Sequence, residues 1–171
     1  RYSVINTRRI GSAPSYECEN TENSEECENT RKNYSDINYA VRYTQKSGNT
    51  EFGLFAAQED DAAFSLGRNY YAISSRSNLG DKTLGYMLTH VNDKFNGTTS
   101  TVNVIDYVSV KSEQLTYFTD ILFSEKDNSS KFGYRSQFNY QPSDFSYFSG
   151  SVLYFDKDFQ LNDLGYLSRS D

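Results

Sequence analysis

The chain has 171 residues, a formal net charge of −6, a hydrophobic share of 36% and an aromatic share of 16%. Its mean hydropathy of −0.74 is low, yet a disordered chain is poor in aromatic residues and this one holds 15 Tyr and 12 Phe. The acidic balance argues against a nucleic-acid partner, which normally meets a clustered basic face. No run of residues approaches the roughly 20 apolar positions of a membrane-spanning helix. Composition therefore favours a β-rich body with polar and aromatic faces.

Residues 1–35 differ from the rest of the chain, because after Arg8-Arg9-Ile10-Gly11 they contain almost no aliphatic side chain. Glutamates are frequent there, and Cys18-Glu19-Asn20-Thr21 is echoed by Cys27-Glu28-Asn29-Thr30. Such a segment cannot bury a core, so we predict a solvated acidic loop at 1–35 and a β-barrel segment at 36–171. A calcium site is the weaker alternative, since no Asp-rich ladder with a turn glycine is present.

The two cysteines, Cys18 and Cys27, both lie in this acidic loop. A thiol pair in an exposed segment favours a disulfide formed in an oxidising compartment such as the periplasm or the cell exterior. Two free thiols are the alternative. A zinc site is disfavoured, because two Cys without a nearby His cannot complete a tetrahedral ligand set. The sequence thus predicts no metal and no cofactor.

From residue 36 onward, apolar and polar side chains alternate with a period of two, and helical spacing is weak. Turn signals such as Ser47-Gly48-Asn49, Asn78-Leu79-Gly80-Asp81 and Asn96-Gly97 separate the alternating runs. We predict about eight long strands in an all-β, antiparallel up-and-down meander. The predicted strands lie at 37–44, 52–56, 64–77, 84–89, 101–110, 115–124, 132–140 and 145–156, with polar connections at 92–100, 126–131 and 141–144.

The predicted strands are long for a soluble protein, in which the average is 5–6 residues, whereas a tilted strand that crosses a bilayer needs about 9–11. In a membrane barrel lipid lies outside and water fills the lumen, so one face of every strand needs no aliphatic side chains. We therefore expect one apolar face and one wet face. Soluble sandwiches and lipocalin-like barrels also alternate, and Asp106 and Thr119 interrupt apolar faces, so a soluble fold stays open.

The segment from Phe159 to Asp171 resembles the aromatic–x–x–N–D–x–G–(F/Y)–L–x–R–x–D element of a bacterial outer-membrane barrel family, the domain of unknown function 5916. The opening Thr7-Arg8-Arg9-Ile10-Gly11 is similar to the S/T–R–R–I–G that begins the barrel part of that family. The motif positions in this chain are Arg8, Arg9, Ile10, Gly11, Asn162, Asp163, Gly165, Tyr166, Arg169 and Asp171.

The family often carries an upstream module similar to family-9 carbohydrate-binding domains, and its members are much longer than this chain. The resemblance therefore implies part of a transmembrane β-barrel in the bacterial outer membrane, associated with carbohydrate. Its expected partners are the lipid bilayer or lipopolysaccharide and the remaining strands of the same barrel. The acidic insert after Gly11 departs from the family pattern.

The chain shows no nucleophile elbow, no phosphate-binding glycine loop and no paired metal motif, so no catalytic residue is predicted. The carboxylates of Glu59, Asp60 and Asp61 are adjacent in a predicted turn, where we expect them to diverge and remain solvated. They do not form the converging pair that glycoside hydrolysis requires. An enzyme that acts on envelope glycans through these three residues is the least favoured of three hypotheses.

The leading hypothesis is a segment of an outer-membrane β-barrel with a structural, pore-forming or uptake-related role. The alternative is a periplasmic or secreted soluble β-sandwich or barrel that binds carbohydrate by stacking sugar rings on exposed tyrosines. The tyrosines considered for this role are Tyr70, Tyr71, Tyr134, Tyr140 and Tyr147.

Overall fold

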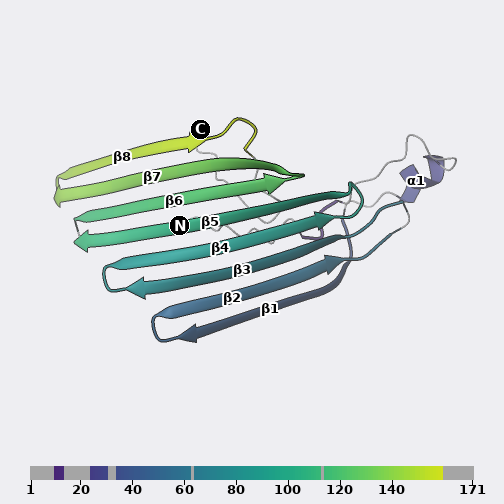
Figure 1. Ribbon diagram of the computed structural model, residues 1–171, viewed down its shortest axis with the longest axis horizontal. Helices are drawn as coiled ribbons and strands as arrows, with labels where there is room; N and C mark the ends of the chain where they lie inside the picture. Colours follow the sequence, from purple (N-terminus) through teal and green to yellow (C-terminus); the bar gives the residue numbers. More distant parts are fainter. Residues whose placement is uncertain (1–9, 14–23, 31–33, 63, 113, 160–171) are drawn as a thin grey trace.

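Eight antiparallel strands form one sheet whose strand order follows the chain, in a computed structural model that describes residues 10–13, 24–30, 34–62, 64–112 and 114–159 (Figure 1). The predicted all-β up-and-down meander is confirmed. In chain order the strands are β1 (Ile37–Ser47), β2 (Thr50–Glu59), β3 (Arg68–Leu79), β4 (Lys82–Asp93), β5 (Thr98–Ser112), β6 (Leu115–Lys126), β7 (Ser129–Ser143) and β8 (Ser146–Phe155). Within the described residues β1 and β8 are the two edges of the sheet.

The two ends of the sheet are built differently. At one end, here called the short-turn end, Gly48 and Gly80 take positive φ angles of 57° and 67° in two-residue connections, a conformation that glycine adopts without strain. At the opposite loop end, residues 60–67 join β2 to β3 and residues 94–97 join β4 to β5. There the carboxylate of Asp93 accepts the backbone N–H groups of Phe95 and Asn96.

Most strands extend a few residues beyond the predicted ranges, and three differences concern the connections between them. The strand predicted at 64–77 begins at Arg68, because Phe64 takes a positive φ of 64° and belongs to the loop that precedes Arg68. The connection predicted at 126–131 shrinks to Asp127-Asn128, whose positive φ angles of 49° and 67° make a tight hairpin turn. The predicted turn at 141–144 falls inside β7, which runs to Ser143 with a register shift between Tyr140 and Ser143.

The acidic segment contains a short helix, α1 (Ser24–Thr30), where a loop was predicted. Figure 1 shows α1 beyond the loop end of the sheet. Glu25 and Glu26 occupy its first turn, where the helix dipole favours negative charge. Cys27 is fully buried, and the structure describes no free cysteine. Cys18 lies outside the described residues, so the Cys18–Cys27 disulfide stays a prediction.

The register of the sheet gives each strand two distinct faces, because residues paired across strands point to the same side. One row of successive cross-strand partners runs from Tyr43 through Leu54 and Ile73 to Leu88. The side of the sheet to which these residues point is here called the apolar face. The adjacent row belongs to the opposite side, here called the charged face. Its members across β1 to β4 are Thr44, Gly53, Ser74 and Met87.

The buried core lies on the charged face, in the half that adjoins the loop end. One cluster contains Ala57, Tyr70, Ala72 and Val91, with Ile10 and Phe55 packed against it; a second contains Val102, Val104 and Leu122, with Phe155 and Phe159. Ile10 and Phe159 come from outside the strands. The expectation of a wholly wet second face is therefore wrong for this half of the charged face, because residues that precede β1 and residues that follow β8 cover it.

Gly67 holds the β2–β3 loop close to β2. A Cβ atom on Gly67 would lie 2.1 Å from the backbone oxygen of Glu59, which cannot swing away. We expect Gly67→Ala to lower the free energy of unfolding by about 1–3 kcal/mol, measured by urea titration with tyrosine fluorescence. The control is Gly48→Asn. A Cβ atom on Gly48 would have no neighbouring atom within 4 Å, and Asn tolerates the positive φ there, so we expect the free energy of unfolding to change by less than about 0.5 kcal/mol. Equal effects of the two variants would contradict this packing.

Candidate functional site

The apolar face carries large hydrophobic side chains across all eight strands, and they are exposed: Ile73 is 50% exposed and Val152 is 62% exposed. The exposed members of this face are Tyr39, Val41, Tyr43, Phe52, Leu54, Tyr71, Ile73, Leu79, Leu84, Tyr86, Ile105, Tyr117, Phe123, Phe138, Tyr140, Phe148, Val152 and Tyr154. Neighbouring strands contribute to one continuous surface.

Charge is segregated between the two faces. Among the residues in the strand pairings, the charged side chains on the apolar face are Lys82 and Glu125, each close to the end of its strand. The charged face holds the others, which are Arg42, Lys46, Glu51, Glu59, Arg68, Arg76, Asp93, Asp106, Asp120, Lys126, Lys131 and Arg135. The middle of the apolar face therefore presents no ionised group to its surroundings.

Several polar atoms on the apolar face are bonded to one another across neighbouring strands, whereas Ser109 Oγ and Thr119 Oγ1 on the same face are buried without a hydrogen-bond partner among the described residues. The pairs and their donor–acceptor distances are Tyr86–Asn103 at 2.8 Å, Tyr117–Ser136 at 3.0 Å and His90–Thr101 at 2.8 Å. Such lateral pairing removes much of the need for water at these groups, because a polar atom in an apolar medium is costly only when it lacks a partner. The face is suited to contact with a medium that offers no hydrogen bonds.

Aromatic rings pack against one another in tilted arrangements along the β6–β8 part of this face. Ring centroids lie 5.4 Å apart for Phe123 and Phe132 and 6.2 Å apart for Phe132 and Tyr154. Cross-strand aromatic pairs of this kind stabilise a sheet beyond simple burial. Gly150 leaves room for the Phe138 ring, since a Cβ atom there would lie 2.4 Å from it.

Glu59 is 1% exposed on the charged face, so the prediction that it is a solvated turn residue is wrong. Its two carboxylate oxygens accept hydrogen bonds from the Tyr70 hydroxyl at 2.9 Å, the Gly11 N–H at 2.8 Å, and the Arg68 backbone N–H, Nε and Nη2 at 3.2, 2.8 and 3.0 Å. A buried carboxylate is tolerated when it is paired in this way. Because several donors already hold these oxygens, the arrangement suits anchoring rather than proton transfer.

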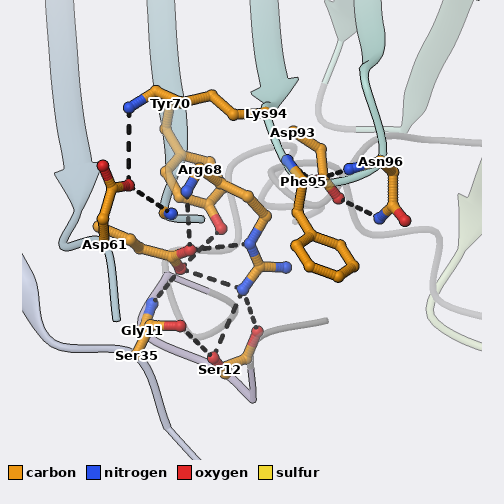
Figure 2. Close-up of polar contacts among 12 residues, drawn as sticks. Gly11, Ser12, Ser35, Asp61, Arg68, Tyr70, Asp93, Lys94, Phe95 and Asn96 are labelled. Atoms are coloured by element: carbon orange, nitrogen blue, oxygen red, sulfur yellow. Dashed lines mark hydrogen bonds and ion pairs between the residues drawn. The ribbon is translucent and has the colours of Figure 1, made fainter. Parts of the chain in front are cut away.

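The clamp formed by Glu59, Arg68 and Tyr70 fastens the segment around residue 11 to the sheet (Figure 2). The Nη2 atom of Arg68 donates to Ser12 Oγ at 3.0 Å, and its guanidinium carbon lies 5.8 Å from the Tyr70 ring centroid. Gly11 has a φ of +77°, and its carbonyl accepts the Ser35 N–H at 3.1 Å. The N-terminal segment therefore reaches the charged face through a charge-assisted contact.

One signal in the sequence points to the burial of Glu59. It follows Phe55 and Ala57 at two-residue spacing, so continued alternation places it on the same face as those apolar residues. Asp60 and Asp61, which come directly after the strand, are exposed as expected. Asp61 accepts the Gly67 N–H at 2.9 Å and lies 3.8 Å from Lys94 Nζ.

The five tyrosines considered for sugar stacking do not form one site. Tyr70 is fully buried with its hydroxyl on Glu59, so the expectation that it is exposed is wrong. Tyr71, Tyr134 and Tyr140 lie on the apolar face at separate levels of the sheet. Tyr147, which is 62% exposed, donates to Asn139 on the charged face.

Two residues of the end motifs, Ile10 and Gly11, belong to the described part of the chain. Ile10 packs on the first core cluster and Gly11 contacts Glu59. Arg8, Arg9, Asn162, Asp163, Gly165, Tyr166, Arg169 and Asp171 lie outside the described residues.

Just beyond β8, Asp156 fastens the last strand to β7. Its carboxylate accepts the Phe132 N–H at 2.7 Å and the Tyr154 hydroxyl at 2.9 Å. These two hydrogen bonds, with the backbone one as the larger contribution, hold the pKa of Asp156 below its usual value.

Across the part of the chain that the structure describes, no three His, Cys, Asp or Glu side chains gather closely enough to bind a metal ion. No helix in that part is long and apolar enough to cross a membrane. The chain matches no protein-family model, no curated protein and no solved structure. Its function is therefore argued from the two faces of the sheet and from the clamp.

The clamp makes a clear prediction for Glu59→Gln. The substitution keeps the shape of the side chain but removes the carboxylate charge that faces the Arg68 guanidinium, whose side chain is 12% exposed. We expect the free energy of unfolding to fall by about 3–5 kcal/mol. The matched control is Asp60→Asn, which removes an exposed charge one residue away and is expected to change it by less than about 0.5 kcal/mol. Similar stabilities for both variants would show that the clamp contributes nothing.

Proposed function

We propose that this chain is a membrane-embedded segment of a bacterial outer-membrane β-barrel, with its apolar face against lipid or lipopolysaccharide acyl chains. The observation that carries the proposal is the continuous exposed apolar face, on which charged residues stand only near strand ends among the paired positions. Lipid-facing surfaces of membrane barrels have this pattern, because an ionised side chain at the bilayer midplane is destabilising.

Strand length supports the same proposal. The eight strands contain 10 to 15 residues each. A strand tilted across a bilayer needs about 9–11 residues, and the average strand of a soluble protein is shorter than any of these. Strands of this length lie at or above the upper end of the usual range in soluble proteins and are long enough to cross a bilayer.

A soluble monomer fits the apolar face poorly. Soluble proteins rarely expose a contiguous apolar patch larger than a few hundred Å². Here all eight strands, from β1 with Val41 to β8 with Val152, contribute exposed hydrophobic side chains to one face, with polar residues such as Asn103 and Ser136 among them. The carbohydrate-binding alternative also loses support, since Tyr70 is buried and the remaining four tyrosines lie on two different faces.

The free edges of β1 and β8 also call for a partner. A long strand with unpaired backbone groups is unstable in lipid, where no water replaces the missing hydrogen bonds. We infer that further strands of the same barrel cover these edges. The role of such a barrel is structural, pore-forming or uptake-related, and the family resemblance adds a link to carbohydrate.

The proposal is tested by moving one charge between the two faces of a single strand. Val152 and Ser151 are adjacent and exposed on β8, and they differ in the face that they occupy. We expect Val152→Arg to lower the stability of the folded protein in lipid vesicles by about 2–4 kcal/mol, measured by urea titration in vesicles.

Ser151→Arg is the matched control, and we expect its stability in vesicles to remain near that of the original chain. Cell fractionation should recover the protein in the outer membrane. Recovery of the protein in the soluble periplasmic fraction, or equal tolerance of arginine at both positions, would refute the proposal.

A further inference from the structure

A row of charged side chains crosses the charged face from β1 to β7 at a single level of the register. Consecutive cross-strand partners in this row are Lys46, Glu51, Arg76, Gly85, Asp106, Asp120 and Arg135. Six of these seven positions are charged, and the seventh is a glycine. We call this set the charged row.

Gly85 allows the two sides of the row to meet over β4. The Nη2 atom of Arg76 lies 2.8 Å from Asp106 Oδ2, although the two residues are on strands separated by β4. A Cβ atom on Gly85 would lie 2.0 Å from Asp106 Oδ1, so a larger residue there would displace this carboxylate. The glycine is therefore required by the ion pair that passes across it.

Two of the three acidic residues of the row are direct cross-strand partners, and each of these two has a guanidinium beside it. Asp106 and Asp120 face each other, which is unfavourable for two like charges. Arg76 pairs with Asp106, and Arg135 pairs with Asp120. With Lys46 and Glu51 included, the row contains three positive and three negative groups and is neutral as a whole.

Water reaches the row, although it does not reach the neighbouring half of the same face. Lys46 and Glu51 are exposed, and the Arg76 side chain is 48% exposed. The partners Asp120 and Arg135 retain 18% and 21% exposure. On the loop side of the row, by contrast, Val102, Val104 and Leu122 are buried. The row marks the place where the dry half of the charged face gives way to the wet half.

We propose that the charged row lines a water-filled passage through the barrel and sets the ratio of cation to anion permeability, which its balanced charges keep close to even. The inference rests on the membrane assignment of the preceding section. Fixed charges along a pore raise the local concentration of the oppositely charged ion. Because the row is neutral, the unaltered protein should discriminate weakly between cations and anions, and removing one sign of charge should expose the other.

The test is the reversal potential of the purified full-length protein in planar bilayers under a KCl gradient. The double variant Asp106→Asn with Asp120→Asn leaves the arginines in excess and should raise the chloride-to-potassium permeability ratio several-fold. The double variant Arg76→Gln with Arg135→Gln should shift the ratio by a similar factor in the opposite direction. Membrane insertion of each variant is checked by fractionation before its currents are interpreted.

Two further variants separate selectivity from folding. Exchanging the charges of one pair, Asp120→Arg with Arg135→Asp, keeps the row neutral and should preserve the original permeability ratio. Removing two turn carboxylates at the short-turn end, Asp81→Asn with Asp144→Asn, should leave the ratio unchanged. If the two double variants of the row conduct ions but keep the original chloride-to-potassium permeability ratio, the inference is overturned. Inserted protein without any conductance would also overturn it while leaving the membrane assignment intact, whereas protein that never enters membranes would fail both proposals.

Discussion

The two-residue alternation of this chain acts through one constraint, the cross-strand register of the sheet. Because paired residues share a side, a shift of one strand by one residue would move its charged side chains to the apolar face. The observed pairings bring Val41, Leu54 and Ile73 to one side and the charged residues of the same strands to the other. Short turns at Gly48 and Gly80 hold neighbouring strands in that register. The membrane assignment and the charged row both depend on it.

The two faces place different demands on the medium around them. The apolar face bonds several of its polar atoms internally, as with Tyr86 and Asn103, which lowers the cost of contact with a phase that offers no hydrogen bonds. The charged face divides into a packed half, where Glu59 anchors the segment at Gly11, and a wet half. The charged row lies at the boundary between the two halves. In the proposed barrel, a sheet with these properties would face lipid on its apolar side and a partly filled, partly aqueous interior on its charged side.

Periodicity was sufficient to predict the class of fold and the number of strands, since alternation is a local property of the sequence. It was insufficient where backbone conformation depends on one or two residues, as at Phe64 and in the Asp127-Asn128 turn. Alternation continued from Phe55 and Ala57 points to the face of Glu59, but no local pattern contains its contact with Gly11, which lies 48 residues away in the sequence. The meeting of Arg76 with Asp106 across Gly85 likewise depends on a register that no local pattern contains.

The most direct test of the two-sided account is a scan of spin labels along β4 in lipid vesicles. Labels at Leu84, Tyr86 and Leu88 lie on the apolar face, and labels at Thr83 and Met87 lie on the charged face. Oxygen concentrates in the bilayer, whereas a water-soluble nickel chelate stays in the aqueous phase. The account predicts that the first three labels collide mainly with oxygen and the other two do so far less. Equal access of the nickel chelate to all five positions would contradict it.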